Sequence, residues 1–402
     1  MIESILIFSR ATPFHHTGGM ETLAWSLATE LARTVPVVRV VTTHIPNRSG
    51  SFSADGVEVV PLPATRPGRY SPAWWRRSRD YWTSLPAPPS AVLSVSAGGY
   101  AVIRARARQP WTPFVLQAHG TSMMEIGSKL RARDLRSLAT APKNAAWLVR
   151  DLVRYRDFDR IVAVGARVAE SLVASPQRWS VPPGRVALIP NGVRPADHGF
   201  DLPARRAVRA ELGIADGVTV VGCVGRLHVQ KRLDRALRAA AVLRDQGAGQ
   251  RFRFLLVGDG PDESRLRGLV RDLRLAELVT FVGRVPPDGV HRYYAAADLA
   301  LLTTARLEVG LPMAILEALA SGLPCVVPTG AAGPGTAGQT ALGPVLHEVD
   351  PGDAGRLAEV LAAVPRPDGG RPSLLPGELT LDHCARSYLS LLAELRGGSG
   401  TP

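Results

Sequence analysis

Residues 219–245 decide the fold class of this chain; they read TVVGCVGRLHVQKRLDRALRAAAVLRD. The apolar run Thr219–Val224 predicts a buried strand. A polar loop follows it, and apolar residues then recur at helical spacing in Arg232–Asp245. The same order of strand, loop and helix recurs in both halves of the chain. This alternation predicts mainly parallel, doubly wound α/β sheets, with ligands bound at the carboxyl ends of the strands.

The length of 402 residues predicts two such domains, because it exceeds what one hydrophobic core usually holds. Residues 194–217 have few long apolar runs, and we expect them to connect the domains. Residues 64–90 are rich in Pro, Arg and Trp and are expected to form an irregular insertion. Residues 122–158 are expected to form a basic, partly helical excursion.

The composition, with 46% hydrophobic and 21% charged residues, is normal for a folded protein. The cysteines Cys223, Cys325 and Cys384 are widely spaced and make no metal-binding pattern. We expect Cys223 and Cys325 to be buried free thiols in a reducing compartment. The chain starts with an apolar strand pattern rather than a basic leader, and no uncharged apolar run reaches the length of a membrane span. A cytoplasmic location is expected.

The formal net charge of +13 is unevenly distributed. Residues 1–200 contain 25 Lys and Arg against 13 Asp and Glu, whereas the remaining residues are nearly balanced. This excess is compatible with an ordinary solvated surface, with attraction to an anionic lipid or phosphorylated acceptor, or with nucleic-acid binding. The aromatic and basic stretch Pro72–Trp82 could form an amphipathic membrane-contact patch or a loop over an acceptor site.

Two loops in the second half carry residues suited to a diphosphate. Arg226 and Lys231 lie between a strand and a helix, where a guanidinium and an ammonium can bind phosphate oxygens. Gly258 and Gly260 end the next strand and would let the backbone approach a ligand closely. Solvated surface cations and an ordinary strand-to-helix turn remain the alternative interpretations.

A third stretch, residues 307–322, places two carboxylates around a Gly-Leu-Pro turn. Glu317 lies within an apolar helical run, where its carboxylate needs a partner or a ligand hydroxyl unless it faces solvent. The amides of Gly310 and Leu311 at the helix start can bind oxygen ligands. Glu308 precedes the turn and is the second carboxylate.

Together these motifs resemble the retaining GT-B glycosyltransferases of family 4, over about Ser4 to Leu392. The resemblance implies two Rossmann-like domains facing a central cleft. The acceptor-binding domain would span residues 1–195 and the donor-binding domain residues 196–379. A C-terminal helix, about residues 380–395, would pack back on the first domain.

The resemblance also implies roles for individual residues. Arg226 and Lys231 would bind the donor diphosphate, His119 would line the reaction centre, and Glu308 would contact the donor sugar. The implied donor contacts are Gly18, Gly19, Gly258, Gly260, Val282, Gly283, Gly310, Leu311 and Glu317. The family usually encloses seven residues between its two glutamates, whereas eight separate Glu308 from Glu317. Anchoring on the Gly-Leu-Pro turn puts Val309 in the acidic place, so either Glu308 serves through a bulge or the sugar contact is lost.

The implied activity is transfer of a sugar from a UDP- or GDP-sugar to an acceptor hydroxyl, with retention of configuration. No cofactor and no metal are expected, because Arg226 and Lys231 can stabilise the leaving diphosphate. The acceptor is left open between a soluble natural product or saccharide and an anionic lipid-linked glycan, with peripheral membrane contact in the second case. Alternative hypotheses are a phosphorylase or nucleotide-sugar epimerase of the same fold, or a basic nucleic-acid-binding protein, although nucleic acid is not the expected partner.

Overall fold

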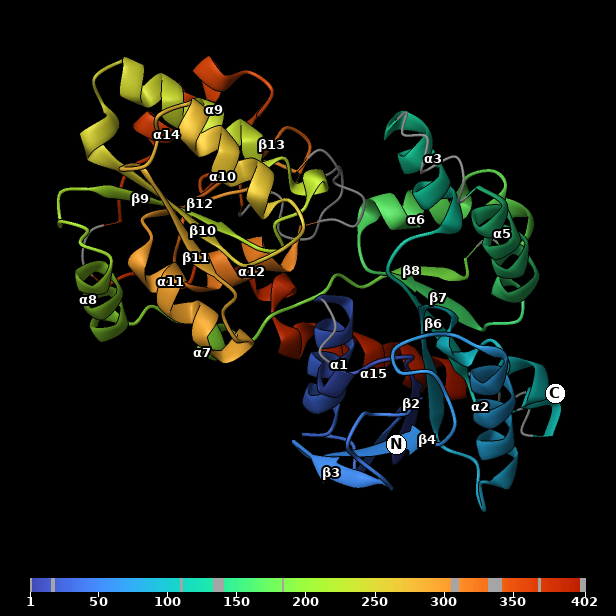
Figure 1. Cartoon of the computed structure of the whole chain (residues 1–402). Helices are drawn as coiled ribbons and strands as arrows, with labels where there is room; N and C mark the ends of the chain where they lie inside the picture. The colour runs from blue at the N-terminus through green and yellow to red at the C-terminus, as the bar shows by residue number, and fades with distance from the viewer. Residues whose placement is uncertain are drawn as a thin grey trace. The chain divides into compact units, whose positions relative to one another are not determined.

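The computed structural model describes residues 2–15, 19–108, 111–132, 141–182, 184–304, 311–331, 342–367 and 370–397. The chain divides into two compact units. The first unit contains residues 1–191 and 381–402, and the second contains residues 192–307 and 311–380. Both are α/β units built around one sheet each (Figure 1). The prediction of two doubly wound α/β domains is therefore confirmed.

The first unit has an eight-stranded sheet that is parallel except for the edge strand β3. In spatial order the strands are β3 (Phe52–Ala54), β4 (Val57–Leu62), β2 (Val37–Thr43), β1 (Ser4–Phe8), β5 (Ala91–Val95), β6 (Phe114–Ala118), β7 (Arg160–Ala163) and β8 (Val186–Leu188). From β1 the chain first adds β2 and its neighbours on one side, and it then returns to add β5 to β8 on the other side. The carboxyl ends of β1 and β5 consequently form a topological switch point.

Alternate residues of β1 enter the two cores of this unit. Ile5 and Ile7 pack on the face covered by α1 (Gly19–Leu31) and α15 (Leu381–Gly397). Leu6 and Phe8 pack on the opposite face. That face is covered by α2 (Pro72–Ser84), the short helix η3 (Ile103–Arg108), α5 (Ala141–Tyr155) and α6 (Ala166–Val173), and α3 (Ser122–Ala132) contacts α5. The period of two in a strand explains this division.

The segment predicted to be an irregular insertion contains helix α2, so that prediction is wrong there. Ser71 caps the helix by accepting a hydrogen bond from the Trp74 amide at 3.2 Å, and Pro72 fits the first turn. Trp74, Ser78 and Trp82 follow at a spacing of four and are fully buried. The two tryptophans are therefore not available for contact with a membrane or with nucleic-acid bases.

The second unit has a six-stranded, fully parallel sheet. In spatial order the strands are β11 (Val279–Gly283), β10 (Phe252–Val257), β9 (Thr219–Val224), β12 (Leu299–Leu301), β13 (Cys325–Pro328) and β14 (Leu346–Val349). In chain order within the unit this is 3-2-1-4-5-6, the order of dinucleotide-binding sheets. The switch point lies between β9 and β12.

Helices cover both faces of the second sheet (Figure 1). One face packs against α9 (Leu233–Asp245), α10 (Glu263–Asp272) and α14 (Ala354–Ala363), and the other against α11 (Val290–Ala296) and α12 (Met313–Ala320). The segment predicted to connect the domains contains α7 (Pro195–His198) and α8 (Leu202–Glu211). An Asp298 carboxylate that binds Arg205 and Arg209 ties α8 to the start of β12.

All three cysteines are buried free thiols, as predicted for Cys223 and Cys325. Within the described ranges, no helix is long and apolar enough to cross a lipid bilayer.

Candidate functional site

The predicted phosphate-binding loop leaves β9 at the switch point of the second unit. It is anchored to the chain beyond β12: the Thr303 hydroxyl donates to the Lys231 carbonyl at 2.9 Å, and the Thr304 hydroxyl donates to the Gln230 carbonyl at 3.1 Å. His228 adds a local cap, because its Nδ1 accepts from the Gln230 amide. The loop is consequently held in place from two strands, β9 and β12.

The loop after β10 packs directly on the loop after β9. The Leu227 amide donates to the Asp259 carbonyl at 2.8 Å, and the Gly225 amide donates to the Val257 carbonyl at 2.9 Å. A Cβ atom at Gly258 would lie 2.2 Å from the Gly225 carbonyl oxygen, and one at Gly260 equally close to that of Leu227. These two glycines are required for close packing of the loops, a reason that the sequence interpretation did not include.

The end of β11 completes this group of loops. The Gly258 amide donates to the Gly283 carbonyl at 2.8 Å, and Val282 is partly buried against the core. The structure therefore brings together the predicted residues after β9 and β10 and at the end of β11. All three loops follow the carboxyl ends of adjacent strands.

The two predicted cations of this site differ in environment. Arg226 is exposed, whereas Lys231 is half-buried, and burial lowers the pKa of the Lys231 ammonium. In the parts of the chain that the structure describes, no carboxylate forms an ion pair with either side chain. A buried ammonium loses hydration that an anionic ligand can replace. The pair therefore supplies positive charge at the switch point, where doubly wound sheets bind phosphates.

Glu317 lies in the second turn of α12 and is half-buried. The hydroxyl of Tyr294, from α11, contacts Glu317 Oε2 at 2.9 Å and the Ala314 carbonyl at 3.0 Å. Burial, and then the nearby Glu317 carboxylate, raise the pKa of Tyr294 well above its usual value, so the phenol stays protonated and donates. Among the described residues no second hydrogen bond engages the Glu317 carboxylate, which leaves Oε1 for a ligand hydroxyl.

Two neighbours of Glu317 were not found by sequence reasoning. The first is Tyr294, and the second is His198 from α7. Burial lowers the pKa of His198, and the nearby Glu317 carboxylate partly offsets this effect. His198 Nδ1 is buried without a hydrogen-bond partner in the described structure. Neither residue is part of a motif, and only the packing of α7 and α11 against α12 brings them to Glu317.

Of the predicted residues around the Gly-Leu-Pro turn, the structure describes Leu311, which is half-buried at the edge of the core before α12. Glu308 and Gly310 lie outside the described residues, as does Val309.

His119 belongs to the first unit and directly follows β6. Its side chain is half-buried, and its Nε2 atom is buried without a hydrogen-bond partner in the described structure. Burial lowers the pKa of His119 to about 4, so the imidazole is neutral near pH 7. Such a ring can exchange hydrogen bonds with hydroxyls but carries no positive charge. Gly19 begins α1, and Gly18 lies outside the described residues.

Comparisons with known proteins agree with this arrangement. Residues 17–197 match the family model described as Glycosyltransferase Family 4, and residues 218–364 match the one described as Glycosyl transferases group 1. A relative, D-inositol 3-phosphate glycosyltransferase from Nocardia farcinica, is 36% identical over 177 residues, which are 41% of this chain and 36% of that protein. The chain spans about a third to just over half the length (35–57%) of the curated relatives it matches.

Solved structures share the fold over nearly the whole chain. Sucrose-phosphate synthase from Thermosynechococcus elongatus is similar with a TM-score of 0.70 at 20% identity, covering 99% of this chain and 97% of that one. HepE from Anabaena, solved with UDP and glucose, is similar with a TM-score of 0.69 at 16% identity, covering 98% and 100%. The two family models together cover most of the sequence, in the order expected of the two units. The chain therefore belongs to the family 4, group 1 glycosyltransferases of the GT-B fold.

Proposed function

We propose that this protein is a retaining glycosyltransferase that moves a sugar from a nucleoside-diphosphate sugar, UDP- or GDP-linked, to an acceptor hydroxyl. The observation that carries the proposal is the pair Arg226 and Lys231. Both lie on a loop that is hydrogen-bonded to the loops of β10 and β12, at the switch point of the second sheet. A held loop with two cations is suited to a diphosphate.

The reaction breaks the bond between the anomeric carbon and the β-phosphate oxygen. The electron pair of that bond leaves with the nucleoside diphosphate, and the acceptor oxygen forms the new bond to carbon. The acceptor proton moves to the departing phosphate oxygen, so attack occurs on the face that the phosphate leaves. Negative charge grows on the phosphate in this step, and Arg226 and Lys231 would stabilise it in place of a metal ion.

Glu317 is assigned to the ribose hydroxyls of the donor. Tyr294 fixes one carboxylate oxygen, which orients the other toward a ligand hydroxyl. The backbone at Val282 and Gly283 is assigned to the nucleotide base, and the contact with the donor sugar is assigned to Glu308 or Val309. His119 is assigned a hydrogen bond to the reacting substrates, because its neutral ring has a buried Nε2 without a described partner.

The acceptor is a hydroxyl compound: a soluble natural product or saccharide, or an anionic lipid-linked glycan. The Nocardia farcinica relative is named for an inositol phosphate acceptor, which supports testing phosphorylated acceptors as well. The proposed location is the cytoplasm, with at most peripheral contact with the inner face of the membrane.

The test measures release of UDP or GDP from a panel of nucleotide sugars with candidate acceptors. Arg226→Ala and Lys231→Ala are each expected to lower kcat by about a hundredfold or more, as for loss of a group that stabilises transition-state charge. Exposed Arg292, on α11, supplies the control variant Arg292→Ala. Chelation with EDTA is expected to leave the rate unchanged. Near-normal turnover in both variants would refute the assignment, and nucleotide-independent cleavage by phosphate would favour a phosphorylase.

A further inference from the structure

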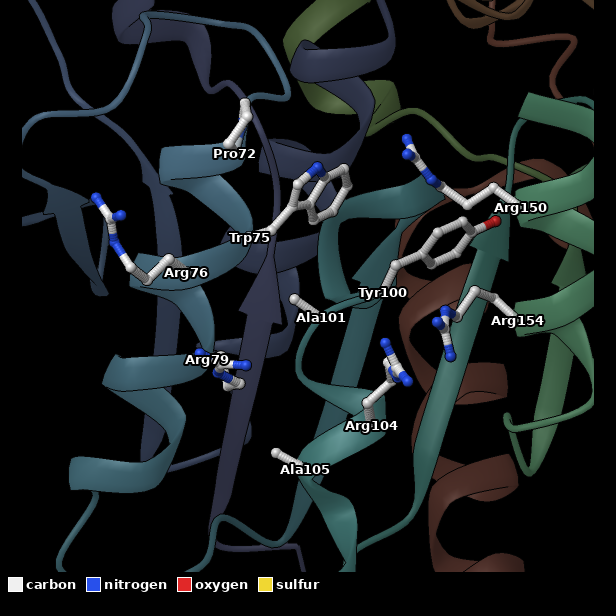
Figure 2. A pocket seen from close by; sticks show the side chains of 10 residues that line it. All are labelled: Pro72, Trp75, Arg76, Arg79, Tyr100, Ala101, Arg104, Ala105, Arg150 and Arg154. Atoms are coloured by element: carbon white, nitrogen blue, oxygen red, sulfur yellow. The ribbon is translucent and has the colours of Figure 1, made fainter. Parts of the chain in front are cut away.

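The first unit has an open pocket whose walls are largely arginine. Its volume is about 790 Å³, within the range of small-molecule sites. The lining side chains that matter here are Trp75, Arg76 and Arg79 from α2, Arg104 from η3, and Arg150 and Arg154 from α5 (Figure 2). All these elements are crossover connections that cover one face of the sheet. We call this site the arginine pocket.

Few carboxylates oppose these charges. In the described part of the chain, Arg154 forms an ion pair with Asp157 at 3.3 Å, and none of the other four arginines has a carboxylate partner. Figure 2 shows the side chains of Arg104 and Arg154 pointing toward each other in the space between α2 and α5. Like charges that line one pocket repel each other, and an anion bound between them would relieve this repulsion.

A buried carboxylate that contacts a lining residue of the pocket is already engaged inside the unit. Asp151, on α5, accepts a hydrogen bond from Tyr100 at 2.8 Å and one from Ser122 at 2.5 Å. The Tyr100 ring lines the arginine pocket, while its hydroxyl is directed to Asp151. The protein therefore supplies a neutral phenol, rather than a carboxylate, at the floor of the pocket.

Part of the pocket is positioned before any ligand binds. The Arg150 guanidinium lies 4.8 Å from the centre of the Trp147 ring and 5.7 Å from that of Trp75. Trp75 is itself stacked on Tyr70, at 5.1 Å between ring centres. This aromatic support reduces the conformational freedom that Arg150 would lose on binding a ligand.

The chemistry of the pocket selects its ligand. Guanidinium groups bind phosphate in a bidentate manner, and a single phosphate has too few oxygens to engage five arginines from three elements. The concave shape favours a discrete ligand over a membrane surface. We propose that the arginine pocket binds a soluble ligand that carries two or more phosphate groups. The ligand's recognition is distinct from that of the donor, because none of the residues assigned to the donor diphosphate lines this pocket.

The test is calorimetric titration of the intact protein with sodium tripolyphosphate. Arg226→Ala and Lys231→Ala are present throughout, so that binding at those two cations is removed. The pocket variant adds Arg79→Gln and Arg104→Gln, and the matched control adds Arg77→Gln and Arg156→Gln. Arg77 and Arg79 lie on α2, all four side chains are exposed, and each pair removes two charges. The expected result is at least about tenfold weaker binding in the pocket variant and less than about twofold in the control.

The remaining outcomes overturn the proposal. Absence of binding to tripolyphosphate would do so, as would an equal loss in both variants, which would indicate attraction to net charge alone.

Sedimentation with vesicles of phosphatidylglycerol and phosphatidylcholine tests the other source of phosphate. Exposed Val149 and Val153 on α5 could insert into a bilayer there. Vesicle binding that depends on the pocket, without tripolyphosphate binding, would assign the arginines to a lipid surface. If the pocket variant does not fold, Arg104→Gln alone replaces it.

Discussion

Replacing Tyr294 with phenylalanine keeps the buried ring and removes the hydroxyl that contacts the Glu317 carboxylate and the Ala314 carbonyl. The Tyr294 side chain is 1% exposed, so water cannot readily take the place of the lost hydroxyl. A hydrogen bond to a charged group contributes about 1.5–3 kcal/mol, and because Glu317 is only half-buried we expect the lower part of that range. If the bond mainly orients Glu317 toward the donor, a loss of about 1.5 kcal/mol weakens donor binding by slightly more than tenfold.

Donor affinity, measured by titration calorimetry, should therefore fall about tenfold in Tyr294→Phe, with a smaller change in kcat. Tyr293→Phe is the matched control, since Tyr293 is the neighbouring, partly buried residue of α11. The decisive comparison is a double-mutant cycle with Glu317→Gln. If Tyr294 acts through Glu317, its replacement has little further effect in the Glu317→Gln background. An equal loss of affinity in both backgrounds would refute the reasoning.

Two further predictions concern stability. Burial lowers the pKa of His119 from 6.5 to about 4, so the neutral imidazole contributes stability above about pH 6.5, and this contribution is lost as the pH falls toward 4. Urea unfolding should therefore show that the free energy of unfolding decreases by up to about 3 kcal/mol over this pH range, and His119→Gln should lack this decrease. An identical pH profile in the variant would contradict the prediction. Gly258→Ala places a Cβ atom against the Gly225 carbonyl, so it should lower the free energy of unfolding by more than about 1 kcal/mol and weaken donor binding. The control Gly217→Ala places its Cβ atom in open space and should change neither quantity. Equal behaviour of the two variants would exclude the packing argument.

Much of the fold could be predicted because the hydrophobic pattern and the elements agree. Buried parallel strands such as β9 and β10 contain uninterrupted apolar runs, residues 220–224 and 254–257, and each strand is followed by a loop with Gly or Pro. The helix α2 was missed for a physical reason. Its buried stripe consists of Trp74, Ser78 and Trp82 and so includes a polar residue, and the nearby prolines suggested a loop. The cap at Ser71 with Pro72 was the signal that could have identified it.

The candidate site could be predicted only where a motif encodes it. Arg226 and Lys231 are recognisable because they are fixed in a short loop after a strand. Tyr294 and His198 are not, because they reach Glu317 from two other helices whose packing no local pattern specifies. Gly258 and Gly260 illustrate a different limit: the sequence indicates that the backbone needs small residues there, and only the structure shows that the neighbour is the β9 loop rather than a ligand alone.

The charge asymmetry shows how composition becomes a site. An excess of arginine in residues 1–200 has no location by itself, and its magnitude is the same whether the charges are dispersed or gathered. Arg76 and Arg79 lie three residues apart on α2, and Arg150 and Arg154 lie four apart on α5, so each pair occupies one face of its helix. That the two faces meet above η3 depends on the order of strands in the sheet, because α2 follows β4 and α5 precedes β7. Topology, rather than the number of charges, therefore makes a phosphate-binding pocket the sharper hypothesis for this half of the chain.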